Sequence, residues 1–420
     1  MRCAIVTFGC RVNQADSRQI EEHLLARGAG GVPCSRADLV IVNTCSVTAT
    51  AEHGARQTIR RIARDHPDVQ IVVTGCYATR CCPEVAALPG VVQVVRNERK
   101  DRLVADLALP DTERFDRGTE PRGVAPAPGA AGRTAYTLRV QTGCNERCSY
   151  CVIPFTRGAA CSQPIDRVLA EVSRVTAAGF KEIALTGVHL GSYGRDLTPP
   201  ASLLTLLQAL DEHVSDDILF RIGSLEPMDC SGQIVDLVSR AGRFAPHFHL
   251  PLQHASDRIL RAMRRPYTQE DYRCLVDGIR SRLPHASIGS DVIVGFPGER
   301  PADADTTLAY LESSPLTHLH VFPYSDRPGT AAAALPLKTS GGEIRLRARL
   351  VRDVGRRLSA RFHRTQIGEV RRALTIGDGS LAVTDNYLKV RIPPGCVRNQ
   401  WVSVKVLTAG ETATGEVVGS

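Results

Sequence analysis

Short apolar runs and amphipathic stretches alternate along the first hundred residues. Short runs of this kind are typical of buried strands, and apolar positions three and four residues apart are typical of helices. The strand candidates are CAIVTF (3–8), DLVIVN (38–43) and QIVVT (70–74), and the helix candidates are 17–27 and 50–64. This alternation predicts a small doubly wound α/β domain with a parallel sheet, which we assign to residues 1–108.

A longer alternation begins after a segment rich in proline and glycine. That segment, 109–132, has few large apolar residues and is predicted to be a linker. Six strand candidates follow within 133–340, with amphipathic stretches between them: AYTLRVQ, KEIALTG, DDILFRIGSLEP, HFHLPLQ, ASIGSDVIVGFP and THLHVFPYS. Six βα repeats predict a (βα)6 partial barrel with its site at the carboxyl ends of the strands. A doubly wound open sheet is the alternative that this pattern does not exclude.

The carboxyl-terminal part of the chain changes character twice. Residues 341–365 contain the run EIRLRARLVRDVGRRLSARFHR, which predicts a basic helix. Residues 366–420 contain short strand-like runs separated by Gly, Asp and Asn turns. A tail of this length and pattern predicts a small β-barrel of the oligonucleotide-binding kind.

Composition narrows the class of protein. A chain of 420 residues, 43% of them hydrophobic, exceeds one hydrophobic core and predicts two or three domains. The amino-terminal stretch is too short for a signal peptide and no run approaches a bilayer span, so we expect a cytoplasmic protein without a membrane partner. The net charge of +8 permits a polyanionic partner without requiring one. Fourteen cysteines in a reducing compartment favour metal sites or catalysis over disulfides.

Three of these cysteines, Cys144, Cys148 and Cys151, lie within eight residues in GCNERCSYC. Their spacing also fits one face of a helix, but Gly143 and Pro154 flank the group and favour a loop. A zinc site with Cys161 as fourth ligand is a second alternative, although no paired CxxC supports it. An iron-sulfur cluster is the third, because three thiolates on four irons leave one iron open to another molecule.

A second set of three cysteines follows the strands of the first domain. Cys10, Cys45 and Cys76 each come just after a strand candidate, in FGC, NTC and TGC. The carboxyl ends of parallel strands meet at one sheet edge, with about 4.8 Å between neighbours. We therefore expect these three side chains to lie together.

The central spacing, CxxxCxxC with an aromatic residue before the last cysteine, resembles the signature of radical S-adenosylmethionine (SAM) enzymes. With TFGCRVNQADS, DLVIVNTCSVT and VVTGCYA, the chain is similar to the methylthiotransferase family among them. The resemblance implies two 4Fe-4S clusters, one held by Cys144, Cys148 and Cys151. The other cluster would be held by Cys10, Cys45 and Cys76. Departures occur at His254 and Ala255, where Ser-Gly is expected, and at Arg96, where Gly is frequent.

The chemistry implied by the resemblance uses SAM twice. One SAM methylates a sulfur atom at the amino-terminal cluster, and a second is cleaved to a 5′-deoxyadenosyl radical that abstracts hydrogen from the substrate. The expected SAM contacts are Tyr150, Gly187, Glu226 and Gly295. Each has a structural alternative, the glycines as turn residues and Glu226 as a solvated strand end. Arg157 reaches a carboxylate or phosphate, or lies on the surface.

The substrate implied by the resemblance is RNA. LTGVHLGSYGRDL and HVFPYSDRPGTAA resemble the group that methylthiolates C2 of N6-threonylcarbamoyladenosine at position 37, in the anticodon loop of tRNA. The tail resembles the RNA-binding TRAM domain. The basic residues expected to contact RNA are Arg345, Arg349, Arg352, Arg356, Arg371, Arg372 and Lys389. A sulfur source and an electron-donor protein are further implied partners.

Several alternatives stay open. Within the family, the same reaction acts on isopentenyl-adenosine tRNA or on a ribosomal protein aspartate. From other classes, the chain is a non-catalytic iron-sulfur RNA-binding or sensor protein, or a zinc-stabilised RNA-binding scaffold. The arginines of 341–365 have their own alternative, a solvated helix that covers the barrel.

Overall fold

The computed structural model describes residues 1–107, 127–129, 133–410 and 412–419, so most of the expected linker at 109–132 lies outside the described residues. The described chain divides into two compact units. The first unit contains 1–107, 142–146 and 151–160. The second unit contains 127–129, 133–141, 147–150, 161–410 and 412–419.

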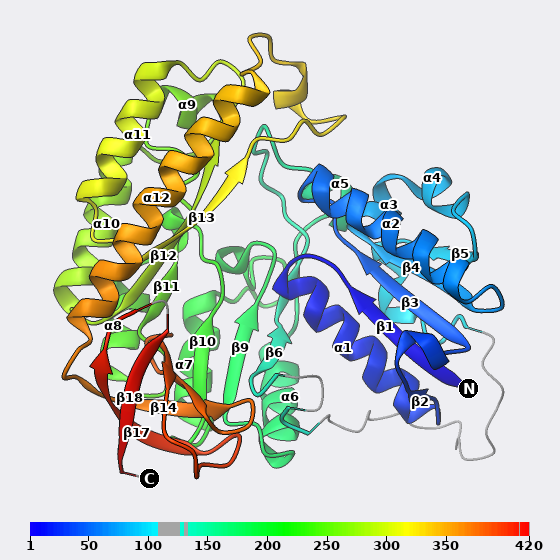
Figure 1. The fold of residues 1–420 in the computed structure, drawn as a ribbon, viewed down its shortest axis with the longest axis horizontal. Helices are drawn as coiled ribbons and strands as arrows, with labels where there is room; N and C mark the ends of the chain where they lie inside the picture. The colour runs from blue at the N-terminus through cyan, green and yellow to red at the C-terminus, as the bar shows by residue number, and fades with distance from the viewer. Residues whose placement is uncertain (108–126, 130–132, 411, 420) are drawn as a thin grey trace. The chain divides into compact units, whose positions relative to one another are not determined.

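The first unit is built on a parallel sheet with the strand order β2-β1-β3-β4-β5 (Figure 1). The strands are β1 (Arg2–Thr7), β2 (Gly30–Gly31), β3 (Leu39–Thr44), β4 (Gln70–Gly75) and β5 (Val91–Val95). The helices are α1 (Arg11–Ala26), α2 (Ala49–Asp65), α3 (Cys76–Arg80), α4 (Cys82–Ala86) and α5 (Ile153–Arg157).

Alternate side chains of β3 pack on opposite faces of this sheet. Val40 and Val42 pack in one cluster with Ile59 of α2, whereas Ile41 packs in the other with Ile20 of α1. Helices on both faces of a parallel sheet give the doubly wound arrangement predicted from the sequence.

Helix α1 begins at Arg11, although its apolar period predicts a start at residue 17. Its first turns bury polar side chains beside the small apolar residues Val12 and Ala15. Asn13 Nδ2 donates to the carbonyl oxygens of Phe8 and Thr44, both at 2.9 Å. A pattern that counts only apolar residues misses a helix start buried by hydrogen bonding.

The second unit contains six parallel strands that neighbour one another in chain order. They are β6 (Tyr136–Arg139), β9 (Glu182–Thr186), β10 (Leu219–Ile222), β11 (His247–His249), β12 (Ser287–Val294) and β13 (His318–Pro323). Hydrogen bonds form the sheets β10-β9-β6 and β11-β12-β13, and the bridge between Ser224 and His249 joins them. A doubly wound sheet reverses its strand order, and this one does not, which agrees with the predicted partial barrel.

Helices cover one face of these strands. They are α6 (Ile165–Ala177), α7 (Leu203–His213), α8 (Gly232–Arg240), α9 (Asp257–Ala262), α10 (Gln269–Arg282), α11 (Pro301–Ser313) and α12 (Gly341–Thr365). The remaining short elements are β7 (Gln141–Thr142), β8 (Cys161–Ser162) and 3-10 helices at Cys34–Arg36, Asn97–Arg102, Leu190–Ser192, Pro227–Asp229 and Ala331–Ala334. One large apolar cluster, which includes Ile288 and Val292 of β12 and Val351 of α12, fills the space between strands and helices.

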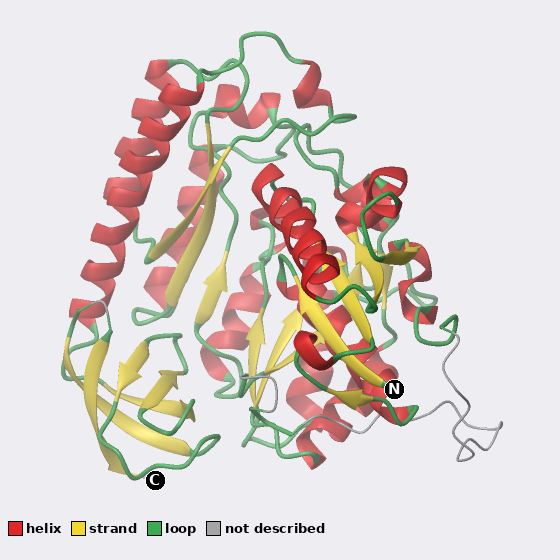
Figure 2. Ribbon diagram, turned by 45° about the vertical axis from the view of Figure 1, so that its right-hand side comes forward, coloured by secondary structure: helices red, strands yellow, loops and turns green. Residues whose placement is uncertain are grey.

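A closed barrel ends the described chain, beside the carboxyl terminus in Figure 2. Its strands are β14 (Val370–Ile376), β15 (Leu381–Thr384), β16 (Lys389–Arg391), β17 (Trp401–Thr408) and β18 (Ala413–Gly419). Small apolar side chains such as Ala373, Val390 and Val404 fill its interior. The barrel agrees with the strand-like tail predicted from the sequence.

Arg221 of β10 connects this barrel to the six-stranded sheet. Its side chain is 1% exposed and pairs with Glu182 of β9 through Nε, at 2.9 Å. The same guanidinium donates to the carbonyl oxygens of Thr384 and Asp385 at 3.1 and 2.8 Å, and it lies 4.8 Å from the ring centroid of Tyr387. One buried cation thus holds two strands and a barrel turn together.

Among the described residues, the helices are all too short or too polar to span a bilayer. The longest, α12, carries arginines along most of its length.

Candidate functional site

Three cysteines lie just beyond the carboxyl ends of adjacent strands in the first unit. Cys10 follows β1, Cys45 directly follows β3, and Cys76 directly follows β4 and opens α3. The register pairs Thr44 with Gly75, so Cys45 and Cys76 stand at the same level of neighbouring strands. The structure therefore places these cysteines at the sheet edge where parallel α/β folds bind ligands.

The thiols of these cysteines affect one another's ionisation. Burial is the main cause that raises the pKa of Cys45 to about 11, and the charges of Cys10 and Cys76 raise it further. Gly9 has a φ of +91°, and a Cβ atom on it would lie 2.4 Å from Cys45 Sγ. The chain before Cys10 can approach the Cys45 sulfur this closely only because position 9 is glycine.

Charged side chains are buried beside the three cysteines. Arg157 Nη2 and Lys100 Nζ each lie 2.9 Å from Asp16 Oδ2, and all three side chains are at most 3% exposed. Burial by itself lowers the pKa of Arg157, but the charges of Asp16 and Cys76 outweigh it and raise the pKa. Burial also lowers the pKa of Lys100, and there Asp16 offsets it only in part. Arg157 thus reaches a carboxylate, as one of the two sequence-based alternatives expected.

This environment fits an anionic group held by thiolates. Arg157 and Lys100 share one carboxylate, and buried positive charge is costly unless more negative charge lies close by. Asn97 adds a polar contact, with 3.6 Å between its Nδ2 atom and Cys76 Sγ. Three thiols, a backbone cradle closed to any side chain at Gly9, and this positive charge form a donor set suited to an iron-sulfur cluster.

The central cysteines Cys144, Cys148 and Cys151 lie in the loop between β7 and α5. Residues 143–152, all of them described, form no helix, so the helical-stripe alternative is wrong. Cys144 and Cys151 belong to the first unit and Cys148 to the second. Within the first unit the backbone N–H of Cys144 donates to the Gly158 carbonyl at 3.1 Å, which holds the start of the loop.

Arg265 connects Cys148 to Glu226 within the second unit. Arg265 Nη1 lies 3.2 Å from Cys148 Sγ, and Nη2 pairs with Glu226 Oε2. Burial by itself lowers the pKa of Arg265, but the neighbouring Glu226 carboxylate outweighs it and raises the pKa. Glu226 therefore lies one guanidinium away from a central cysteine, beyond the carboxyl end of β10.

The other three expected SAM residues have structural explanations in the second unit. Tyr150 packs against a small apolar cluster that contains Ile259, Met263 and Phe296. A Cβ atom on Gly187 would lie 2.9 Å from Gln141 Oε1, which accepts the next two backbone N–H groups.

Gly295 has a φ of +78°, and Ile344 of α12 fills the space where its side chain would stand. Tight packing accounts for this glycine without a cofactor. The roles of Tyr150, Gly187, Glu226 and Gly295 toward SAM stay predictions.

The residues expected to contact RNA fall into two classes. Those on the surface of α12 and of the barrel are exposed: Arg345, Arg349, Arg352, Arg356 and Lys389. Of these, Arg356 also pairs with Asp353 on the same helix. The other two are held by groups of the barrel. Arg371 bonds both carboxylate oxygens of Asp385 at 2.7 and 2.9 Å, and the guanidinium of Arg372 lies 3.9 Å from the ring centroid of Trp401.

Sequence reasoning missed Asp16, Lys100 and Arg265. Asp16 and Lys100 are 84 residues apart, and no short motif joins them. The available signal was the polar pair Asn13 and Asp16 on a helix beside the sheet, where apolar side chains are the rule.

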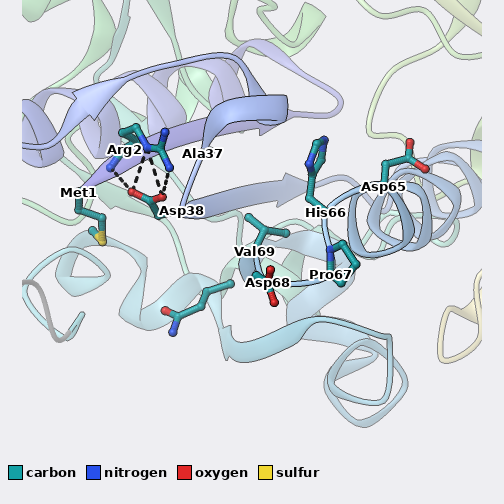
Figure 3. Close-up of a pocket in the computed structure, with 10 residues that line it drawn as sticks. Met1, Arg2, Ala37, Asp38, Asp65, His66, Pro67, Asp68 and Val69 are labelled. Atoms are coloured by element: carbon teal, nitrogen blue, oxygen red, sulfur yellow. Dashed lines mark hydrogen bonds and ion pairs between the residues drawn. The ribbon is translucent and has the colours of Figure 1, made fainter.

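A pocket of about 500 Å³ lies at the opposite edge of the first sheet, where β1, β3 and β4 begin (Figure 3). It is lined by Met1, Arg2, Ala37, Asp38 and residues 65–70, and an ion pair of 2.6 Å joins Arg2 to Asp38. The cysteines stand at the other ends of these strands, so this pocket is no part of their site.

Comparison with known families divides the chain much as its fold does. Residues 2–96 match the family described as "Uncharacterized protein family UPF0004", and residues 138–311 match the "Radical SAM superfamily". Over 409 residues the chain is 34% identical to the "Threonylcarbamoyladenosine tRNA methylthiotransferase MtaB" of Aquifex aeolicus, across 93% of this chain and 96% of the relative.

Two further relatives bear on the specificity of the chain. It is 35% identical to the protein of the same name from Bacillus subtilis, over 79% of this chain and 75% of that one. It is 33% identical to the "tRNA-2-methylthio-N(6)-dimethylallyladenosine synthase" of Nitrosomonas europaea, over 80% and 79%.

Among solved structures, the fold resembles the radical S-adenosylmethionine methyltransferase TsrM of Kitasatospora setae. The TM-score is 0.56 at 16% identity, over 79% of this chain and 74% of that one. At this identity the likeness concerns the fold alone.

Proposed function

Because this chain belongs to the methylthiotransferase family of radical SAM enzymes, we propose that it adds a methylthio group to C2 of N6-threonylcarbamoyladenosine at position 37 of tRNA. One observation carries the choice of substrate. Similarity to the threonylcarbamoyladenosine enzyme of Aquifex aeolicus extends over 93% of this chain and 96% of that enzyme. Four further relatives of the same name match at 30% to 35% identity.

The family uses a 4Fe-4S cluster and SAM, and we propose that this chain holds two such clusters. Cys144, Cys148 and Cys151 would hold one. Cys10, Cys45 and Cys76 would hold the other. When bound, the cluster at Cys144, Cys148 and Cys151 would supply the electron for reductive cleavage of SAM. The cluster in the first unit would hold the sulfur atom to be transferred.

The chain's own side chains tune these sites. Cys45 and Cys76 are each 3% exposed, whereas Cys10 is exposed, so the fold keeps water from two of the three thiols. Arg157 and Lys100 compensate the negative charge of the thiolates there. Arg265 does the same for Cys148 and orients Glu226, which is placed to accept hydrogen bonds from the ammonium or ribose groups of SAM.

We further propose that exposed cations on α12 and the barrel bind the tRNA backbone. Arg345, Arg349, Arg352 and Arg356 recur at helical spacing and are exposed, as is Lys389. Arg371 and Arg372 have internal partners, and we assign them to the stability of the barrel instead. A tRNA substrate agrees with the cytoplasmic location expected from the sequence, while the electron-donor protein and the sulfur source stay predictions.

Mass spectrometry of nucleosides from a deletion strain tests the substrate. Digested tRNA from the strain is expected to lack 2-methylthio-N6-threonylcarbamoyladenosine and to accumulate the unmethylthiolated nucleoside. The wild-type gene should restore the product, whereas the Cys45→Ala variant should not. Unchanged product together with loss of the isopentenyl derivative would assign the chain to the other tRNA substrate.

A second assay tests the non-catalytic alternative. Reconstituted protein incubated with SAM and dithionite is expected to release 5′-deoxyadenosine. A sensor or a zinc scaffold releases none.

A further inference from the structure

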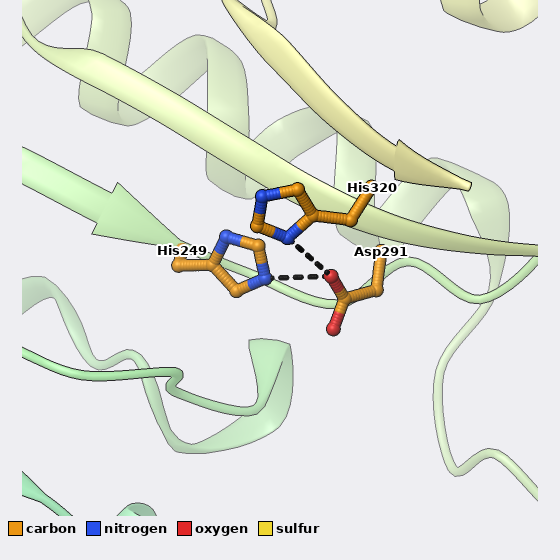
Figure 4. A group of neighbouring side chains, drawn as sticks. All are labelled: His249, Asp291 and His320. Atoms are coloured by element: carbon orange, nitrogen blue, oxygen red, sulfur yellow. Dashed lines mark hydrogen bonds and ion pairs between the residues drawn. The ribbon is translucent and has the colours of Figure 1, made fainter. Parts of the chain in front are cut away.

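Two histidines and one aspartate meet on three adjacent strands of the second unit, away from the cysteines in sequence. His249 ends β11, Asp291 lies within β12, and His320 lies within β13 (Figure 4). No motif considered in the sequence pointed to them. Part of the signal was present as alternation, because HFH and HLH each place histidines on every second strand position.

The register of the sheet brings these side chains to one face. Asp291 stands directly opposite His320, and His249 stands opposite Gly289, two residues before Asp291. Their neighbours Phe248 and Val292 point the other way, into the main apolar cluster. The three polar side chains therefore project from the face that the helices do not cover.

The two separations from the Asp291 carboxylate fit coordination of one metal ion. His249 Nε2 lies 2.8 Å and His320 Nδ1 lies 3.2 Å from Asp291 Oδ1, and one ligand atom from each residue falls within 4.8 Å of the others. Ligands at about 2.1 Å from a metal and at right angles to each other stand about 3.0 Å apart. Figure 4 shows both imidazoles turned toward the same carboxylate oxygen.

A third histidine ring beside these ligands also has a defined place. His318 lies beside both, with centroids 6.1 Å from His249 and 5.8 Å from His320, whereas the rings of the two candidate ligands stand 5.0 Å apart. Its position depends on Gly289, since a Cβ atom there would lie 2.0 Å from His318 Nε2. A glycine opposite His249 thus leaves room for a ring that restrains both candidate ligands.

We propose that His249, Asp291 and His320 bind one divalent first-row transition-metal ion, independently of the iron-sulfur sites. Two imidazoles and one carboxylate suit zinc, cobalt, manganese or ferrous iron, and three protein ligands leave coordination positions open. The His320 side chain is 59% exposed, so solvent or a small molecule can reach those positions.

Zinc content measures the proposed site directly. Full-length protein with its iron reconstituted is dialysed against Zn²⁺, then against metal-free buffer, and its zinc and iron are counted by mass spectrometry. We expect about one more zinc per chain in the wild type than in Asp291→Asn or His320→Ala, with equal iron in all three. His213→Ala, an exposed histidine at the end of α7, is the matched control and should keep the zinc.

A second readout separates binding from misfolding. Zinc is expected to raise the melting temperature of the wild type and of His213→Ala but not that of Asp291→Asn, because a ligand that binds only the folded state stabilises it. A Cys45→Ala variant should keep the extra zinc, which excludes a first-unit site that depends on Cys45 as its source. Equal zinc in the wild type and the Asp291 and His320 variants means adventitious binding and overturns the proposal. These readouts do not depend on tRNA, so the proposal can fail while the methylthiotransferase function stands.

Discussion

The two cysteine triads differ in how the chain assembles them. Cys144, Cys148 and Cys151 come from one loop, and their spacing in the sequence is itself the signature. The first-unit triad comes from three strand ends, and only the fold brings its thiols together. A loop triad therefore depends on local sequence, whereas a strand-end triad depends on the sheet and on the charges buried under it.

The largest expected effect separates the roles of the two triads. Cys148→Ala should reduce both 5′-deoxyadenosine release and tRNA methylthiolation to background. Cys45→Ala should abolish methylthiolation and leave SAM cleavage. Chromatography of 5′-deoxyadenosine and nucleoside mass spectrometry measure the two products, with exposed Cys274→Ala as control. Loss of SAM cleavage in Cys45→Ala would contradict a division of labour between the triads.

The buried charges under the first-unit triad can be removed next. Arg157→Met should lower the free energy of unfolding of the first unit by about 3 kcal/mol, because it leaves part of a buried ion-pair network without its partner. The exposed Arg61→Met on α2 of the same unit should change it by no more than about 0.5 kcal/mol. Urea unfolding of the iron-free protein gives both values. Equal, small effects would place Arg157 outside the network that supports this site.

A pH series tests the burial of Cys45. Burial raises the pKa of Cys45 from its ordinary value of 9.0 to about 11, so the folded state favours the neutral thiol. This stabilising contribution is complete below about pH 9 and is lost as the pH rises toward 11, a total of about 3 kcal/mol. Urea unfolding of the iron-free protein between pH 8 and 11 should show this loss in the wild type and a smaller one in Cys45→Ala. Parallel curves for the two proteins would refute the assignment.

The smallest expected effect concerns one hydrogen-bond donor. Asn97→Ala removes the amide 3.6 Å from Cys76 Sγ, which favours the more negative, reduced state of the attached group. The midpoint potential of the first-unit cluster should fall by the equivalent of about 1 kcal/mol, while the central cluster keeps its potential. A redox titration followed by electron paramagnetic resonance resolves the two, with Gln93→Ala on the same sheet as control. A shift in both potentials would mean that the amide acts through the fold and not on one sulfur.

The positions of most strands could be predicted because they coincide with apolar runs in the sequence. The strands β1, β3 and β4 and the six strands of the partial barrel fall where the apolar runs indicate. The start of α1 could not be predicted in this way. Asn13 is buried because it forms hydrogen bonds, and a pattern of apolar residues does not reveal such a position.

The candidate site was predictable to the extent that strand ends define it. Cys10, Cys45 and Cys76 follow from the parallel topology. Asp16 and Lys100 did not follow, because their contact joins distant parts of the chain. Gly295 was assigned a functional role from the sequence, to admit the adenine of SAM, but the structure also gives it a packing role, because it makes room for Ile344.

The buried guanidinium of Arg221 has a consequence for the distance between the terminal barrel and the six-stranded sheet. Because it holds the turn at Thr384 and Asp385 against β10 and β9, the terminal barrel is rigidly attached to the sheet and does not move on a flexible tether. The distance from the barrel to the strands of the sheet is then set by the protein itself, before any nucleic acid binds.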